Sequence, residues 1–224
     1  MTNPTSSRER ILSRLRGSPA PFPDAPNATQ PYLSVTNLPD TSPEALLTRF
    51  QHEWEALKGE ITITPTPEAA IQTVIGLIGE AKQVMSWEPL PLPGLPEALH
   101  AQGVAVARPT VRGEDRSGTY AALDPISVGI TGADGALATT GTLILNTQGG
   151  QGRLPSLLPP RHLVLLRRDR LFTHLEGWLA AEGRALLEAS RSVALVSGPS
   201  KTGDIEMQII YGVHGPKIVH VIVF

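Results

Sequence analysis

Hydrophobic residues change their spacing several times along this 224-residue chain. Apolar side chains recur every three or four positions over 43–57 and again over 67–78, which predicts two amphipathic helices. Short continuous apolar runs, such as 218–224, instead predict strands that are buried in a sheet. The same patterns predict helices over 7–16, 43–57, 67–78, 96–102 and 171–187, and strands over 61–63, 81–87, 104–107, 126–130, 136–138, 143–145, 162–166, 192–196 and 218–224.

The order of these elements predicts the fold class. Strand, helix and strand follow one another between residues 60 and 107, which indicates parallel pairs of strands with right-handed crossovers. We therefore expect an α/β protein with a mostly parallel open sheet flanked by helices. Residues 1–58 would form an N-terminal helical arm with a proline-rich connection, and 59–224 the α/β domain.

A glycine-rich stretch, 124–145, lies at the centre of the predicted domain. Its glycines and threonines suit tight turns and the close approach of a ligand to the main chain. Such a segment can direct backbone N–H groups at an anion, or it can be an ordinary β-meander. The first alternative makes Thr131, Gly132, Thr140 and Gly141 candidate ligand-binding residues.

Two further segments are candidates for the same anion site. Arg153 stands alone in a glycine-rich loop. Its planar guanidinium can bind a carboxylate or phosphate through two N–H groups, or it can donate hydrogen bonds to carbonyls of the loop. Ser200, Lys201 and Thr202 follow a predicted strand at an expected helix start, where free N–H groups favour anions. The alternative there is a capped helix without a ligand.

Composition excludes several classes of function. The net charge of −2 gives no electrostatic footprint for nucleic acid, and the chain contains no cysteine to hold an iron–sulfur cluster. No apolar run approaches the ~18 residues of a membrane span, and no secretory signal is evident, so we expect a cytoplasmic protein. No nucleotide-cofactor fingerprint is visible, and we expect no cofactor. His162, His214, Asp204 and Glu206 lack the spacing of a zinc motif, so we expect no metal.

Two segments carry a resemblance to a known family. GITGADGALATTGTLIL with GRLPSLLPPRHLVLL, and SGPSKTGDIEMQIIYGVHGPKIVHVIV, resemble the lactate utilisation protein C family, which has a LUD domain. The resemblance implies a fold similar to the sugar-phosphate isomerase and CoA-transferase group. It also implies a bacterial system that oxidises L-lactate to pyruvate, in which partner proteins hold the iron–sulfur clusters.

One position departs from the family pattern. Thr139 stands where relatives often have glutamate, and in related CoA-transferases a glutamate is the nucleophile. A threonine cannot form the acyl anhydride, which disfavours that chemistry. The leading hypothesis is a non-redox accessory or regulatory subunit that binds a small anion. The alternatives are an isomerase, acyl-transferase or ligase acting on a phosphorylated or CoA-linked molecule, with Asp204, Glu206 or His214 as acid or base, and an interaction module with a vestigial site.

Overall fold

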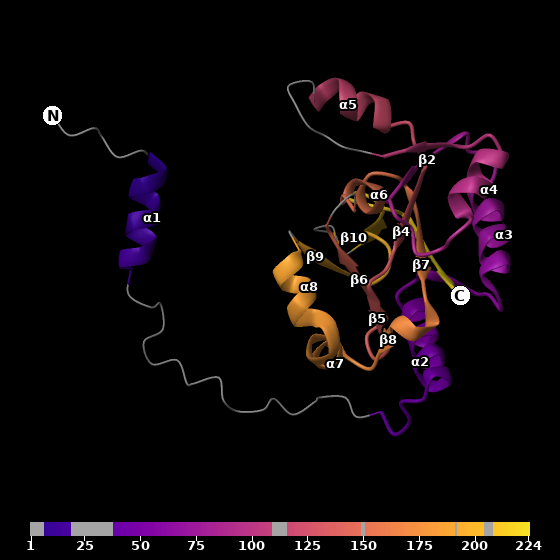
Figure 1. Cartoon of the computed structure of the whole chain (residues 1–224), viewed down its shortest axis with the longest axis horizontal. Coiled ribbons are helices and arrows are strands. Elements are labelled where there is room, and N and C mark those ends of the chain that lie inside the picture. Colours follow the sequence, from indigo (N-terminus) through magenta and orange to yellow (C-terminus); the bar gives the residue numbers. More distant parts are fainter. Residues whose placement is uncertain (1–6, 19–37, 109–115, 149–150, 191, 204–207) are drawn as a thin grey trace. The chain divides into compact units, whose positions relative to one another are not determined.

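The computed structural model describes residues 7–18, 38–108, 116–148, 151–190, 192–203 and 208–224. Contacts divide the chain into two units, Met1–Val35 and Thr36–Phe224. The first unit contains helix α1 (Ser7–Gly17), which confirms the helix predicted over 7–16 and has exposed apolar side chains at Ile11 and Leu15. All other elements belong to the second unit (Figure 1).

A six-stranded sheet, sheet A, is the centre of the second unit. Every neighbouring pair in it is parallel, and the strand order is β1-β12-β7-β4-β2-β3. Its strands are β1 (Glu60–Ile63), β2 (Gln83–Ser86), β3 (Ala105–Ala107), β4 (Val128–Gly132), β7 (Arg161–Leu166) and β12 (Ile218–Val223). The predicted α/β class and parallel sheet are therefore confirmed.

One predicted pairing is wrong. The sequence order suggested that β1 and β2 are neighbours, but β12, β7 and β4 lie between them. These three strands are buried along almost their whole length, so they take the central positions where both faces of the sheet are covered. Local spacing predicts that a segment is a strand, while its partner depends on contacts distant in sequence.

A second sheet, sheet B, packs on one face of sheet A. It has the order β8-β5-β6-β9. Its strands are β5 (Gly135–Leu137), β6 (Thr142–Asn146), β8 (Leu171–Phe172) and β9 (Val193–Val196). Leu143 and Leu145 of β6 share a core with Val164 and Val221 of sheet A, while Ile144 faces the opposite way, toward Trp178.

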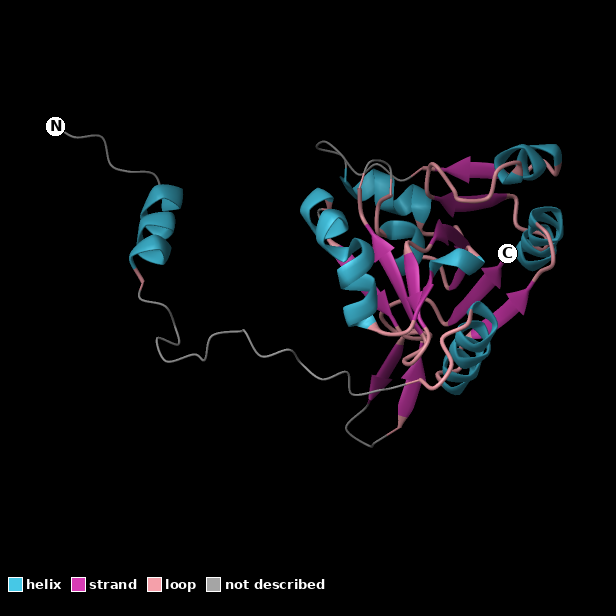
Figure 2. Cartoon of the chain, turned by 60° about the horizontal axis from the view of Figure 1, so that its bottom comes forward, coloured by secondary structure: helices cyan, strands magenta, loops and turns pink. Residues whose placement is uncertain are grey.

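Helices cover the outer faces of both sheets, so the second unit has four layers (Figures 1 and 2). α3 (Pro67–Ile78) and α4 (Leu95–Ala101) pack on the free face of sheet A. α7 (Leu175–Trp178), the π-helix η2 (Leu179–Gly183) and α8 (Arg184–Ala189) lie beyond sheet B. The remaining helices are α2 (Pro43–Ala56), α5 (Arg116–Leu123), α6 (Leu154–Leu157) and the 3₁₀ turn η1 (Arg168–Arg170).

α2 belongs to the core of the larger unit. Leu46, Phe50 and Trp54 are buried with residues of both sheets, and the Trp54 indole N–H donates to the Glu60 carbonyl at 2.8 Å. The packing of the larger unit thus extends into residues that the sequence assigned to the N-terminal arm. The domain boundary at residue 58 stays a prediction.

Two secondary-structure predictions are corrected by the structure. The helix expected over 171–187 begins only at Leu175, because Leu171–Phe172 pairs with β5 as a strand. The helix expected after Ser200 is absent from the described part of that segment. Lys201–Gly203 forms β10 instead, antiparallel to β11 (Ile209–Tyr211).

Candidate functional site

A small cleft lies where β4 and β2 end. It has a volume of about 170 Å³, and its wall includes Trp87, Pro89, Pro91, Gly132, Asp134 and Gln151. Trp87 directly follows β2, and Gly132 is the last residue of β4. The cleft therefore lies at the carboxyl edge of a parallel sheet, which is where open α/β folds bind their ligands.

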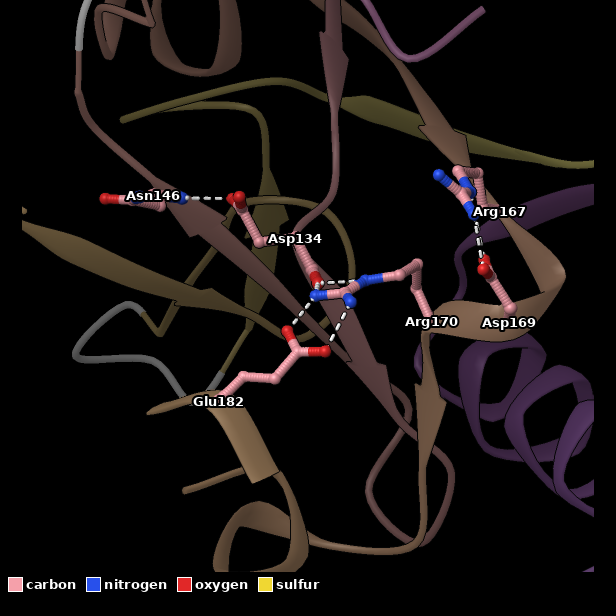
Figure 3. Close-up of polar contacts among 6 residues, drawn as sticks. All are labelled: Asp134, Asn146, Arg167, Asp169, Arg170 and Glu182. Atoms are coloured by element: carbon pink, nitrogen blue, oxygen red, sulfur yellow. Dashed lines mark hydrogen bonds and ion pairs between the residues drawn. The ribbon is translucent and has the colours of Figure 1, made fainter. Parts of the chain in front are cut away.

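Asp134 is the ionisable residue among the described residues that line this cleft. It lies in the two-residue connection through which the chain leaves sheet A and enters sheet B. Its backbone N–H donates to the Ile144 carbonyl at 2.8 Å. Its Oδ2 accepts from the Asn146 backbone N–H, also at 2.8 Å (Figure 3). Both bonds come from β6, so the pairing of sheet B fixes the carboxyl group.

A charged pair holds Asp134 from the other side. The Arg170 guanidinium donates to the Asp134 carbonyl, with Nε at 2.9 Å, and also binds the Glu182 carboxylate (Figure 3). The hydrogen bond that Arg170 donates to Glu182 raises the pKa of Arg170, so this guanidinium keeps its charge. Glu182 lies in the π-helix η2, a type of irregularity that is frequent at functional sites.

Burial raises the pKa of the Asp134 carboxyl above its usual range. The Asn146 N–H and the charge of Arg170 oppose this effect in part. A carboxyl group in a cleft with a raised pKa can exchange protons closer to neutral pH than an exposed one can. The arrangement is therefore suited to hydrogen bonding with a ligand or to acid–base work.

Several polar atoms around this site are buried without a partner among the residues that the structure describes. They are Oε1 of Gln151, both amide atoms of Asn146 and the indole nitrogen of Trp178. Buried polar groups are normally hydrogen-bonded, and a group without a partner calls for a water or a ligand. Of these residues, Gln151 lines the cleft itself.

The predicted binding residues of the glycine-rich stretch are only partly at this cleft. Gly132 lines it, but the adjacent Thr131 is fully buried and its hydroxyl lies 2.8 Å from Nε2 of His162. Thr140 and Gly141 form the turn between β5 and β6. A Cβ on Gly141, whose φ is +57°, would lie 2.8 Å from the backbone of α2, so this glycine serves packing.

The other predicted residues lie in two separate segments, at the start of α6 and at β10. Arg153 is exposed at the N-terminal cap of α6. Ser200 donates its backbone N–H to the Pro216 carbonyl, and the Lys201 ammonium lies 6.0 Å from the Tyr211 ring centroid. None of the three lines the cleft. Ligand binding by Arg153, Ser200, Lys201 and Thr202 stays a prediction.

The predicted acid and base residues fall outside the cleft or outside the described residues. His214 is exposed before β12, while Asp204 and Glu206 are not among the residues that the structure describes. Over the described ranges, no three His, Asp or Glu side chains gather as a metal site, and no helix is long and apolar enough to cross a membrane.

Sequence reasoning missed Asp134, Trp87 and Gln151 as a group. One signal was available for Asp134, because an acidic residue directly after a buried strand lies at the ligand-binding edge of a parallel sheet. Gln151 and Trp87 come together only through the fold, where the Trp87 indole N–H donates to the Gly152 carbonyl at 2.6 Å. No local pattern connects these segments.

Comparison with known proteins identifies the family. A family model for the LUD domain matches residues 47–224. The chain belongs to the LUD domain family. The LUD domain thus spans both sheets and most of α2.

Curated relatives of this LUD-family chain include several named "Lactate utilization protein C". The one from Shouchella clausii is 30% identical over 193 residues, which cover 80% of this chain and 79% of the relative. The one from Deinococcus radiodurans is 33% identical over 130 residues, covering 58% and 60%. The uncharacterised protein NMB1437 of Neisseria meningitidis is 39% identical over 94 residues, and the chain spans only 40% of its length.

A solved structure supports the fold. The crystal structure of a DUF162 family protein from Deinococcus radiodurans matches 82% of this chain and 99% of its own, with a TM-score of 0.62 and 23% identity. At this identity the likeness establishes the architecture alone.

Proposed function

We propose that this LUD-family chain takes part in lactate utilisation as a non-redox accessory or regulatory subunit. The observation that carries the proposal is the 30% identity to a protein named "Lactate utilization protein C" over four fifths of both chains. The chain has no cysteine, so it cannot ligate an iron–sulfur cluster through thiolates. In this proposal partner proteins in the cytoplasm hold the clusters and carry the electrons.

Growth of a deletion strain tests the role in lactate utilisation. We expect slow growth on L-lactate as sole carbon source, normal growth on glucose, and recovery when the gene is supplied on a plasmid. Equal growth of the deletion strain on both carbon sources would contradict the pathway assignment.

Purified proteins test the non-redox part of the proposal. The chain alone should be colourless and should not reduce an electron-accepting dye with L-lactate. Co-purification with a cysteine-rich protein from lactate-grown cells, and dye reduction only by the assembly, would support a subunit role. Dye reduction by the lone chain would overturn it.

Asp134 favours a second candidate function, an independent enzyme. Its carboxyl group lies in a cleft, accepts the Asn146 backbone N–H and has a raised pKa, and Arg170 holds its main-chain carbonyl. Activity assays on phosphorylated and CoA-linked small molecules test this alternative. Turnover that Asp134→Asn abolishes, without loss of thermal stability, would support an enzyme; absence of turnover across the panel would leave the subunit role as the better account.

The predicted anion site has its own test. Inorganic phosphate should raise the melting temperature if Arg153 and Lys201 bind anions, since a ligand that binds only the native state stabilises it. Lys201→Ala should then reduce the shift. A shift that is unchanged in Lys201→Ala would remove Lys201 from the proposal.

A further inference from the structure

We propose that the cleft beside Asp134 binds a small molecule that donates hydrogen bonds through hydroxyl or ammonium hydrogens and carries no negative charge. This proposal goes beyond the role in lactate utilisation and does not depend on it. It rests on the inventory of hydrogen-bonding groups in the described cleft wall, on the charge of that wall, and on its apolar surface.

Two side-chain groups of the wall, the Asp134 carboxylate and the Gln151 amide oxygen, can accept hydrogen bonds from a ligand. One carboxylate oxygen of Asp134 receives the Asn146 N–H, and an ionised carboxylate has further lone pairs available. Oε1 of Gln151 is buried and has no partner among the described residues. A bound molecule would donate hydrogens to Asp134 and, after a turn of the Gln151 side chain, to its Oε1, which relieves the cost of a buried acceptor without a partner.

Two strong side-chain donors near the cleft, those of Trp87 and Arg170, are already engaged. The Trp87 indole N–H donates to the Gly152 carbonyl, and the Arg170 guanidinium is bound by Glu182 and the Asp134 carbonyl. Pro89 and Pro91 have no backbone N–H to offer. No arginine or lysine is among the described residues that line the cleft, and the nearby Arg170 is paired with Glu182, so a carboxylate or phosphate would meet Asp134 without a free cation to compensate its charge.

The remaining wall suits a carbon skeleton. The apolar part of the wall is made by Pro89, Leu90, Pro91 and Trp87. Ligand sites commonly combine such apolar walls with a few fixed polar groups. The volume of about 170 Å³ exceeds the ~10–15 Å³ that a single water requires, so the cleft has room for a small organic molecule.

The fixed position of Asp134 makes the site selective. Its backbone is held by β6 and by Arg170, and its carboxyl by the Asn146 N–H. A ligand therefore meets an acceptor that is already oriented, and little ordering remains to oppose binding.

Indole N–H resonances in two-dimensional NMR spectra give a direct test on the full chain. The protein has three tryptophans, and only Trp87 lines the described part of the cleft. Trp87→Phe assigns its resonance. The probes are ribitol and glycerol for the hydroxyl class, ethanolamine for the ammonium class, and L-lactate and inorganic phosphate for the anions.

We expect ribitol, glycerol or ethanolamine to shift the Trp87 resonance in a saturable way, and the anions to leave it in place. Asp134→Asn should weaken that binding by about 10- to 100-fold, as expected for loss of a hydrogen bond to a charged group. If Asp134→Asn weakens the binding of ethanolamine more than that of the polyols, the ligand belongs to the ammonium class. Equal weakening of both identifies the hydroxyl class. Gln151→Leu should weaken the binding of both classes of probe.

Asp124→Asn is the matched control, because it makes the same chemical change at an exposed position away from the cleft. It should bind the probes as the wild type does. Saturable binding of L-lactate or phosphate at Trp87, or no response to any uncharged or cationic probe, would overturn the proposal. Either result is independent of the growth experiment, so failure of this site and failure of the pathway assignment can be told apart.

Discussion

Gly129 in β4 provides the sharpest test of how the cleft region is packed. A Cβ built on this buried glycine would lie 1.8 Å from the carbonyl oxygen of Pro155 in α6. Real contacts of this kind are longer by more than an ångström, and a backbone oxygen cannot move aside as a side-chain tip can. Gly129→Ala therefore forces α6 away from β4, or separates β4 from its neighbours.

The expected loss of stability follows from two opposing effects. Inserting a methyl group into a packed interior costs about 1–3 kcal/mol. The lower entropy of an unfolded alanine chain offsets up to about 1 kcal/mol. Because the clash is with backbone, we expect a net loss of about 2 kcal/mol. In a unit the size of Thr36–Phe224, this lowers the melting temperature by about 4–8 °C.

Thermal and urea denaturation, followed by circular dichroism, measure the effect. Gly76→Ala is the matched control, since a Cβ at this position on α3 meets no atom within 4 Å beyond its chain neighbours and its own helix backbone. Alanine within a helix should stabilise that variant by about 0.5–1 kcal/mol. A Gly129→Ala protein that melts at or above the wild-type temperature would refute the close packing of α6 on β4.

Three further predictions concern titrating and buried groups. Burial lowers the pKa of His162 to about 3, so the folded state resists protonation below the unfolded value of 6.5. The free energy of unfolding should therefore fall by up to about 1.4 kcal/mol per pH unit as the pH drops below ~6.5. His162→Gln should flatten this decline in urea titrations. Equal slopes of unfolding free energy against pH in the wild type and the variant would contradict this prediction. The raised pKa of Asp134 gives a pH dependence of stability of the opposite sign. The folded state holds the proton to higher pH, so ionisation lowers stability as the pH rises through the range in which carboxyl groups titrate. Asp134→Asn should remove this loss. A steeper decline of stability with rising pH in Asp134→Asn would contradict this prediction. The Thr139 hydroxyl donates to the Thr173 carbonyl at 2.9 Å, so Thr139→Val should lose about 1 kcal/mol in chemical denaturation while Thr139→Ser does not; similar losses in both would assign the effect to packing.

Local signals in the sequence predicted the helices on either side of sheet A well. Ser42 and Thr66 each precede a proline, and in the structure their hydroxyls accept backbone N–H groups of α2 and α3. Capping depends on residues within one turn, so it can be read from adjacent letters. The apolar run of β12 likewise predicted a central strand, because burial on both faces removes the alternation.

The segment after Ser200 shows where such signals become ambiguous. Hydroxyl, lysine and acidic residues there suit a helix start, yet the same residue types favour turns. The structure pairs Thr202 with Ile210 in an antiparallel hairpin. That pairing depends on residues eight positions away, and helix capping rules take no account of it. The predicted anion site relied partly on this helix start.

The candidate cleft was harder to predict because it depends on both sheets at once. Gly132 allows the Pro91 ring to approach, since a Cβ at residue 132 would lie 2.9 Å from that ring. Two residues later Asp134 is aligned by β6 of sheet B and by Arg170, which the π-helix holds through Glu182. A change in the helical layer beyond sheet B, such as Glu182→Gln, can therefore alter the position of Asp134 without touching the cleft wall. This connection gives the outer helices a physical route to influence a ligand at the sheet edge.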